Sequence, residues 1–447
     1  MASNPSRYGP RSQSLLARDH TSVWHPFTQH ARWPNDEPLV IDRADGMHLY
    51  DADGRGYLDA NSSLWVTVHG HRVPKIDEAI TAQLGRLDHA TFLGSTHEPG
   101  IRLAEMLVER APAGLTRAFF GGDGASSVEA AIKMAFQAAA QRGEQRPLYA
   151  HIAQGYHGDT LGAVSVGGID LFHATYRPIL LDTVAVSSPG ERAAGQSPAE
   201  RAAEVVAELA DLLAREGGRV CAVVVEPMVQ AAAGILTHDA AFLQGVRRLC
   251  DEHGAYMVVD EVATGIGRTG RMWAVDHAGI SPDLLTLGKG VTGGYLPLSA
   301  VLAREEIFEA FLGTPESGRT FFHGHSYTAN PLCCAASIAN LELIDENRVI
   351  DNAARIGDLL GEWLAPLAAH DGVHEIRRIG TMTGIEVRPV DGIERTGHEV
   401  CRVMRRNGVL TRPLGDVVVL MPPLAMGEDD LRTIVDVCID AVHQVVQ

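Results

Sequence analysis

Between about residues 100 and 340, short apolar runs alternate with longer amphipathic segments, and this alternation constrains the fold more than any other feature. Short apolar runs bounded by turn residues are typical of buried strands, and longer amphipathic segments are typical of helices. A chain that alternates the two is expected to build an α/β fold, with a mostly parallel sheet covered by helices on both faces. The expected strands are 118–120, 148–152, 183–186, 222–225, 256–259 and 284–287, and the expected helices are 103–110, 127–141, 199–216 and 240–253.

The two ends of the chain follow a different rhythm. Residues 48–51 and 57–59 predict a hairpin that turns at Asp53-Gly54, and the last hundred residues return to strand and helix. A chain of 447 residues is also too long for one hydrophobic core. We therefore expect residues 71–340 to form a large domain, with 1–70 and 341–447 combining into a smaller α+β domain.

Composition excludes several classes of protein. A formal net charge of −18 argues against nucleic acid or an anionic membrane as the main partner. No apolar run is long enough to span a bilayer, and residues 1–20 lack the apolar core of a signal peptide. The first fifteen residues are expected to be mobile. Six scattered cysteines without a C-x-x-C pair argue against a zinc ribbon or a disulfide framework, so we expect a reducing, cytoplasmic location.

A glycine-rich turn follows the first expected strand of the predicted parallel sheet. In parallel α/β sheets, ligands bind at the carboxyl ends of the strands. Residues 121–126 read Gly-Gly-Asp-Gly-Ala-Ser and open a helix. Exposed amides at a helix N-terminus favour an anion, typically phosphate. A tight turn capped by Ser126 or Ser127 is an equally good interpretation of this segment alone.

Two later strand ends carry ionisable side chains. Asp260 and Glu261 follow the run 256–259, where buried carboxylates need partners, so Asp260 would hold a metal, act as a base or pair with a ring cation. Lys289 stands between two glycines after 284–287. A desolvated lysine has a lowered pKa and attacks carbonyls readily, whereas an exposed turn lysine is the ordinary alternative.

Together, the three strand ends match the needs of pyridoxal phosphate. That cofactor requires a phosphate cradle, a carboxylate opposite its ring nitrogen and a lysine for its aldehyde. Tyr156, in the segment 155–160, offers an aromatic ring to stack on the cofactor, although it would serve equally as an ordinary core residue. Gln230 follows another apolar run and is placed to bond the ring hydroxyl.

The spacing of these residues resembles a known family. Asp260-Glu261-Val262, Thr264-Gly265 and the run 267–270, with Lys289 twenty-nine positions after Asp260, resemble the class III, fold type I aminotransferases. The resemblance runs from about Trp24 to the C-terminus. It narrows to the branch that acts in biotin synthesis, through the segments 24–29, 62–65, 68–71, 155–160, 293–297, 323–327, 410–414 and 421–423.

This resemblance implies a homodimer whose active sites are shared between subunits. Lys289 would hold the cofactor covalently, Asp260 would face the pyridine nitrogen and Tyr156 would stack on the ring. Ser326 would reach the phosphate of the neighbouring subunit. The other residues that the resemblance assigns to the cofactor are Gly124, Ala125, Ser126, His157, Glu226, Gln230 and His325.

The resemblance also implies the reaction, in which 7-keto-8-aminopelargonate receives an amino group and becomes 7,8-diaminopelargonate. Arg412 would bind the carboxylate of the keto acid, a role that suits an always-charged bidentate donor. Phe27 stands where many members have Tyr, and Leu64 replaces the first of a Trp pair. These departures leave S-adenosylmethionine and lysine open as amino donors. The expected substrate contacts are Phe27, Leu64, Trp65, Tyr156, Arg268, Gly324 and Arg412.

Several alternatives stay open at this point. Another class III aminotransferase acting on an ω-amino acid, a diamine or acetylornithine would share the chemistry, as would a mutase or decarboxylase of the same fold. The pairs His69/His71 and His323/His325 suggest a metal enzyme, but no third ligand is spaced to join them, so we predict no metal. A binding module without catalysis would leave Lys289 and Asp260 without a purpose.

Overall fold

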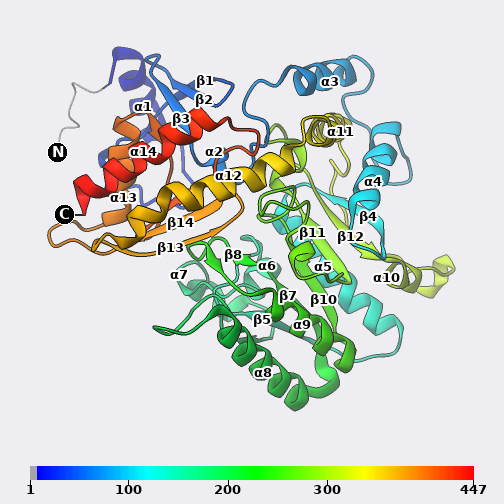
Figure 1. Ribbon diagram of the computed structural model, residues 1–447. Helices are drawn as coiled ribbons and strands as arrows, with labels where there is room; N and C mark the ends of the chain where they lie inside the picture. Colours follow the sequence, from blue (N-terminus) through cyan, green and yellow to red (C-terminus); the bar gives the residue numbers. More distant parts are fainter. Residues whose placement is uncertain (1–7, 447) are drawn as a thin grey trace.

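The computed structural model describes residues 8–446 and has two parts (Figure 1). A large part surrounds a seven-stranded sheet, and a smaller part gathers elements from both ends of the chain. The strands are β1 Ile41–Asp45, β2 His48–Asp51, β3 Gly56–Asp59, β4 Leu115–Gly121, β5 Leu148–Ile152, β6 Thr183–Val186, β7 Val220–Val225, β8 Val229–Gln230, β9 Leu236–Thr237, β10 Tyr256–Asp260, β11 Leu284–Leu287, β12 Ser299–Arg304, β13 Val373–Ile379, β14 Met382–Val387, β15 Val409–Leu410, β16 Pro413–Leu414 and β17 Val417–Leu420.

The helices alternate with these strands in the middle of the chain, as the sequence predicts. They are α1 Pro10–Ser22, α2 Ser62–Trp65, α3 Pro74–Leu84, α4 Glu98–Arg110, α5 Gly124–Gln141, α6 Leu161–Ser165, α7 Asp170–His173, α8 Pro198–Glu216, α9 Ala240–His253, α10 Glu305–Ala310, α11 Pro331–Glu346, α12 Val349–Leu364, α13 Thr396–Arg406 and α14 Glu428–Val445.

The large sheet has the order β4-β12-β11-β10-β7-β5-β6. The neighbours from β11 to β6 run parallel, whereas β12 is antiparallel to both β11 and β4. The expectation of a mostly parallel α/β sheet is therefore confirmed. β12 was not among the expected strands, although residues 300–303 form a short apolar run of the same kind.

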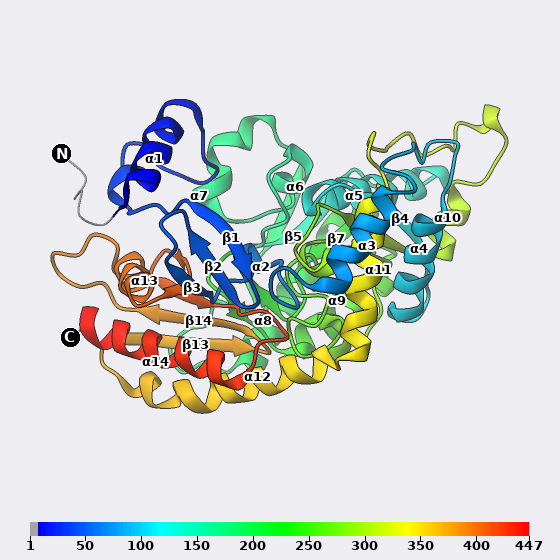
Figure 2. The ribbon, with the colours of Figure 1, turned by 90° about the horizontal axis from the view of Figure 1, so that it is seen from above.

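Helices cover both faces of this sheet, because alternate residues of its central strands enter two different cores. Val223 and Met257 belong to the core that includes α8 and α9, and their neighbours Val224 and Val258 belong to the core that includes α5. Figure 2 shows α8 and α9 on one side of the strands and α5 on the other. A strand buried on both faces reads as continuous apolar sequence, which is why these strands were predictable.

The two ends of the chain meet in the smaller part. β15 adds to the sheet β1-β2-β3 by pairing in parallel with β3, so Val409 lies opposite Leu58. Leu58 and Ala60 share a core with Leu360 of α12 and Ile434 of α14. These contacts support the expected division at residues 70 and 340, which stays a prediction.

The N-terminal expectation is only partly addressed by the structure. Pro10–Ser22 forms α1, which begins inside the fifteen residues that we expected to be mobile, and residues 1–7 lie outside the described part. All six cysteines are free and buried. In residues 8–446, no helix has the length and apolar character that crossing a membrane requires.

Candidate active site

A cavity of about 560 Å³ opens at the carboxyl ends of β5, β7, β10 and β11. A polar side chain at or just after the end of each of these strands lines this cavity. Its lining residues are Phe27, Leu64, Trp65, Asp123, Gly124, Ala125, Tyr156, His157, Gly158, Asp159, Thr160, Phe172, Glu226, Ala231, Ala232, Asp260, Val262, Ala263, Lys289, Arg412 and Leu414. We call Tyr156, His157, Glu226, Asp260 and Lys289 the strand-end wall, and Phe27, Leu64, Trp65, Arg412 and Leu414 the chain-end wall.

Asp260, the last residue of β10, has a buried carboxylate that is held by three groups. His157 Nδ1 lies 2.7 Å from its Oδ2, while Val262 N and the Thr286 hydroxyl donate to its Oδ1 at 3.0 and 3.1 Å. Burial alone would lower the pKa of His157, but the hydrogen bond and charge of Asp260 outweigh it and raise that pKa. The three hydrogen bonds therefore fix the Asp260 carboxylate beside the cavity.

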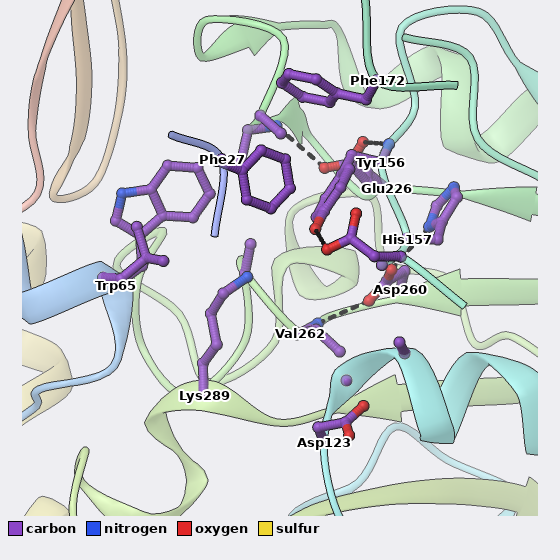
Figure 3. Close-up of a pocket in the computed structure, with 18 of the residues that line it drawn as sticks. Phe27, Trp65, Asp123, Tyr156, His157, Phe172, Glu226, Asp260, Val262 and Lys289 are labelled. Carbon is purple, nitrogen blue, oxygen red and sulfur yellow. Dashed lines mark hydrogen bonds and ion pairs between the residues drawn. The ribbon is translucent and has the colours of Figure 1, made fainter. Parts of the chain in front are cut away.

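Lys289 follows β11 and has a backbone φ of +43°, an uncommon conformation for a residue with a side chain. Burial lowers the pKa of its amine, although the charges of Asp260 and Glu226 oppose this shift. Its Nζ lies 5.1 Å from the centre of the Trp65 ring. In Figure 3 the lysine extends into the pocket between Trp65 on one side and Tyr156 and Asp260 on the other. The arrangement favours a neutral, nucleophilic amine.

Glu226, which follows β7, fixes the backbone beneath Tyr156. Its two carboxylate oxygens accept from Tyr156 N at 3.1 Å and from Ala231 N at 3.0 Å. Burial raises the pKa of the Glu226 carboxyl to about 7. The Tyr156 hydroxyl donates to Asp159 at 3.0 Å, so both ends of this residue are held. Tyr156 therefore presents a fixed ring to the cavity.

The N-terminus of α5 forms another part of the lining. Its cap is Asp123, whose carboxylate accepts from Ser126 N at 2.8 Å, rather than the Ser126 or Ser127 cap that the sequence suggested. Gly124 and Ala125 line the cavity, and Ser126 does not. A Cβ at Gly158, which has φ +119°, would lie 2.4 Å from Ala125 Cβ, so the loop after β5 packs against this helix end only because it carries glycine.

The chain-end wall comes from segments far apart in the sequence. Phe27 and Leu64 are 60% and 46% exposed, and the Phe27 ring meets the edge of Phe172 with 5.4 Å between ring centres. Arg412 follows β15. Among residues 8–446, its guanidinium has no hydrogen-bond or ion-pair partner. An unpaired cation at the edge of an otherwise apolar wall is suited to a carboxylate on a ligand.

Two predicted contacts lie outside the cavity lining. The Gln230 side chain accepts from the Ser188 hydroxyl and donates to Ala153 O at 2.7 Å. Arg268 is buried and donates to Pro422 O and Thr67 O, each at 2.8 Å, and burial lowers its pKa to about 9. Both side chains bind the protein itself here, so their assignment to cofactor and substrate stays a prediction.

Gly324, His325 and Ser326 also lie outside the lining of their own chain's cavity. They belong to an irregular segment in which Gly324 and Ser326 are exposed and His325 N bonds the Thr328 hydroxyl at 2.9 Å. Their expected role, which involves a neighbouring subunit, stays a prediction.

Three of the four histidines in the two pairs have separate hydrogen-bond partners in the structure. His71 lies 3.0 Å from Asp59, His69 lies 3.2 Å from Asn340 O, and His323 lies 3.1 Å from Lys133. In the described residues, no group of three or more His, Cys, Asp or Glu side chains is placed to hold a metal ion.

Several lining residues were missed by the sequence interpretation. Phe172 comes from the four-residue helix α7, and Asp159 follows Tyr156 by three positions. Asp159 lies in the segment 155–160 that we had singled out, so its neighbours were a usable signal. Phe172 had no such signal, because its position depends on how a short helix folds back over the loop after β5.

Comparison with known proteins agrees with this geometry. The family model described as aminotransferase class-III matches residues 30–442. The chain belongs to the class-III aminotransferases. Among curated members of this family, adenosylmethionine-8-amino-7-oxononanoate aminotransferase of Nitratidesulfovibrio vulgaris is 48% identical over 440 residues, which cover 95% of this chain and 81% of the relative. The enzyme of that name from Aquifex aeolicus is 43% identical, covering 95% of this chain and 96% of the relative.

Solved structures of other transaminases share the whole fold. The adenosylmethionine-8-amino-7-oxononanoate aminotransferase of Methanocaldococcus jannaschii is 36% identical and superposes with a TM-score of 0.92, covering 97% of this chain and all of that one. An amine transaminase from an uncultivated Pseudomonas species, in its PLP-bound form, is 33% identical with a TM-score of 0.89, covering 95% and 99%. The fold-type expectation is thereby confirmed.

Proposed function

We propose that this aminotransferase converts 8-amino-7-oxononanoate, also called 7-keto-8-aminopelargonate, to 7,8-diaminopelargonate in biotin synthesis. The observation that carries the proposal is the 48% and 43% identity, over 95% of the chain, to relatives named for that substrate. The cavity supports it, because a mostly apolar lining with the Arg412 guanidinium at its edge suits an aliphatic chain that ends in a carboxylate.

We also propose pyridoxal phosphate as the cofactor, and the residues present fit it. A Cβ at Gly124 would collide with Val262, and one at Gly158 with Ala125, so a close-packed, side-chain-free turn borders the helix N-terminus where a phosphate is favoured. Asp260 is fixed beside the cavity and Lys289 opens into it. When bound, the cofactor supplies an aldehyde that condenses with amines and a ring that accepts electrons from the substrate carbon.

Lys289 has two tasks in this proposal. Its Nζ binds the cofactor between turnovers. When it is not bound to the cofactor, the amine would carry a proton to and from the substrate carbon whose amino group is exchanged. The lowered pKa of Lys289 favours the unprotonated amine, which both tasks require.

The remaining residues of the strand-end wall would orient the cofactor ring and place a negative charge beside it. Asp260 would hold its negative charge opposite the ring nitrogen, and His157 Nδ1 fixes the carboxylate from behind. Tyr156 would cover one face of the ring, with Glu226 holding its backbone. On the opposite wall, Arg412 would bind the carboxylate of the keto acid, and Phe27, Leu64 and Trp65 would exclude water from its chain.

Amino donor, assembly and location belong to the same proposal. S-adenosylmethionine and lysine are the two candidate donors, and both present an α-carboxylate that Arg412 suits. A homodimer would bring Gly324, His325 and Ser326, which lie outside their own cavity, to the site of the other subunit. The six free, buried cysteines support a reducing, cytoplasmic setting.

The testing experiment records the absorbance spectrum of the purified protein, loaded with pyridoxal phosphate, before and after each donor is added alone. S-adenosylmethionine or lysine is expected to shift a visible band near ~420 nm toward ~330 nm, and later addition of the keto acid to restore it. Initial rates with both substrates varied are expected to give parallel lines, because the donor leaves before the acceptor enters. Intersecting lines, or no visible band, would contradict the proposal.

A substrate panel separates this proposal from other class-III activities. An (S)-enantioselective ω-transaminase from Thermomicrobium roseum superposes with a TM-score of 0.92 at 30% identity, so the fold alone does not choose the substrate. We expect the protein to use 8-amino-7-oxononanoate in preference to simple ω-amino acids, diamines and acetylornithine. Preference for one of those amines with pyruvate as acceptor would assign the alternative activity.

A further inference from the structure

The segment 61–65, which carries two residues of the chain-end wall, has an unusually strained backbone. Ser62, Ser63 and Trp65 all have positive φ, at +48°, +60° and +65°. Ser63 combines its φ with a ψ of −80°, outside the regions that residues with side chains normally occupy. Such conformations persist only where surrounding contacts impose them, and they cluster at functional sites.

A single carboxylate imposes much of this conformation. Asp59, the last residue of β3, is fully buried. Its Oδ1 accepts from Asn61 N at 3.1 Å, and its Oδ2 accepts from Ser63 N at 2.7 Å. The His71 ring lies 3.0 Å from Oδ2 on the other side and completes the set. Asp59 itself is held by the turn between β1 and β2, since its N–H donates to Met47 O at 2.9 Å.

The strained segment leads directly to the cavity. Asn61 Oδ1 accepts from Trp65 Nε1 at 3.1 Å, and the Ser62 hydroxyl donates to Met421 O at 2.7 Å. The Trp65 ring then lies 5.1 Å from Lys289 Nζ, on the side of the pocket opposite Tyr156 (Figure 3). Trp65 is buried and lines the cavity, whereas Ser63 is exposed and does not line it.

We propose that Asp59 is a positioning residue that holds the segment 61–65 in its strained form and thereby places Trp65 and Leu64 against the substrate. Asp59 touches neither the cavity nor Lys289, so it acts through the backbone amides that it binds. The inference rests on the proposed function for its kinetic readout, while its backbone readout does not depend on any activity.

Asp59→Asn tests the proposal, because an amide presents one acceptor oxygen and one NH₂ group to three donors. Amide exchange in a peptide spanning residues 60–67 is expected to accelerate in the cofactor-loaded enzyme. The KM for the keto acid should rise about tenfold, the effect of losing one charge-assisted hydrogen bond, with a smaller change in kcat.

Asp51→Asn is the matched control. Asp51 is a buried aspartate in the same sheet whose carboxylate also takes three donors, Asp53 N, Arg55 N and the Tyr57 hydroxyl. It does not bind the segment 61–65. A comparable fall in the melting temperature with an unchanged KM is expected. An equal KM change in both variants would reduce Asp59 to a merely structural role and overturn the proposal.

The substitution Ser63→Gly tests whether the backbone conformation, rather than packing around Asp59, controls the KM. Glycine adopts positive φ without the steric penalty of a side chain, so Ser63→Gly is expected to restore most of the KM when combined with Asp59→Asn. Ser63→Val, which adds a β-branched side chain at φ +60°, should raise the KM with Asp59 intact, and it serves if Asp59→Asn does not fold. Failure of the rescue, or a neutral Ser63→Val, would overturn the proposal. Exchange rates decide it even if the wild type acts on another substrate.

Discussion

The two walls of the cavity are built in different ways. The strand-end wall comes from the ends of neighbouring strands in one sheet, and its carboxylates are buried with every oxygen hydrogen-bonded. The chain-end wall comes from segments near residues 27, 64 and 412. It combines the exposed side chains of Phe27 and Leu64 and the buried Trp65 ring with a cation that has no partner among residues 8–446. We infer that the first wall carries the chemistry and the second selects the substrate.

This difference follows from how each wall is stabilised. Groups held by a sheet lose little freedom when a ligand binds, so they suit steps that need fixed geometry. Side chains on irregular segments are more easily exchanged without loss of the fold, so they suit a choice among substrates. Substitutions in the two walls should therefore separate turnover from binding.

Lys289→Ala should have the largest effect, because it removes both the covalent anchor and the proton carrier. We expect turnover to fall at least ~10³-fold, within the range for loss of a general base and nucleophile. The chain has only three lysines, so borohydride reduction followed by peptide mapping should label one residue. Lys75→Ala, which removes a surface lysine paired with Glu342 and Glu346, is the control and should leave turnover unchanged. Labelling at Lys75 or Lys133 instead would exclude Lys289.

Glu261, a buried carboxyl that lies next to the strand-end wall in sequence, should make stability depend on pH. Burial raises the pKa of Glu261, beside Asp260, from 4.5 to about 7. Its folded-state pKa exceeds the unfolded value, so its contribution is fully present below about pH 4.5 and is lost as pH rises toward 7. The contribution of Glu261 to the free energy of unfolding falls by about 3 kcal/mol over this pH range.

Glu261→Gln should flatten that dependence. The glutamine can still accept from Val275 N, and the Thr264 hydroxyl can rotate to accept from its NH₂ group. We expect the unfolding midpoint of the cofactor-free protein to fall less between pH 5 and pH 8 in the variant than in the wild type. Equal slopes for the two proteins would show that Glu261 titrates normally.

On the chain-end wall, Arg412→Ala should weaken binding more than turnover. Loss of one charge-assisted contact at a partly solvated site costs about 2 kcal/mol, or roughly 30-fold in the KM for the keto acid. Arg412→Lys should recover part of this loss, because it keeps the charge without the bidentate geometry. An unchanged KM would place the carboxylate elsewhere in the cavity.

The smallest effect is expected from Phe27→Tyr, which adds one hydroxyl to an exposed ring. We expect the relative use of S-adenosylmethionine and lysine to change by roughly threefold to tenfold, the range for one neutral hydrogen bond. The ratio of kcat/KM for the two donors is the measurement. Leu64→Trp is the companion variant. If neither variant changes this ratio, the chain-end wall does not select the amino donor.

The positions of Asp260 and Lys289 at one edge of the sheet were predictable from sequence, and the reason is physical. Asp260 directly follows one apolar run, Lys289 follows another after Gly288, and parallel strands bring their carboxyl ends to one edge. The large sheet was predictable for a related reason, since strands buried on both faces are apolar throughout. Among the seven strands of the large sheet, only β12 was missed, because its apolar run follows a glycine-rich turn rather than a helix.

The direction of individual side chains was less predictable. Gln230 and Arg268 are assigned to ligands by the sequence, and their polar groups also bond Ala153 and Thr67 of the protein itself, which the sequence did not indicate. Phe172 and Asp59 gave no signal in the sequence. The position of Phe172 depends on the short helix α7, and the role of Asp59 depends on the two backbone amides that its carboxylate binds. Sequence patterns place a residue on an element, whereas tertiary contacts decide what its side chain faces.

The pairing of β3 with β15 has a consequence for how the protein is made. Leu58 finds its neighbour Val409 only after roughly 350 further residues have been added to the chain. At a synthesis rate of about 5–20 residues per second, one edge of β3 stays unpaired for about 20 to 70 s. Exposed strand edges are sites of aggregation, so the nascent N-terminal segment needs shielding until the last part of the chain leaves the ribosome.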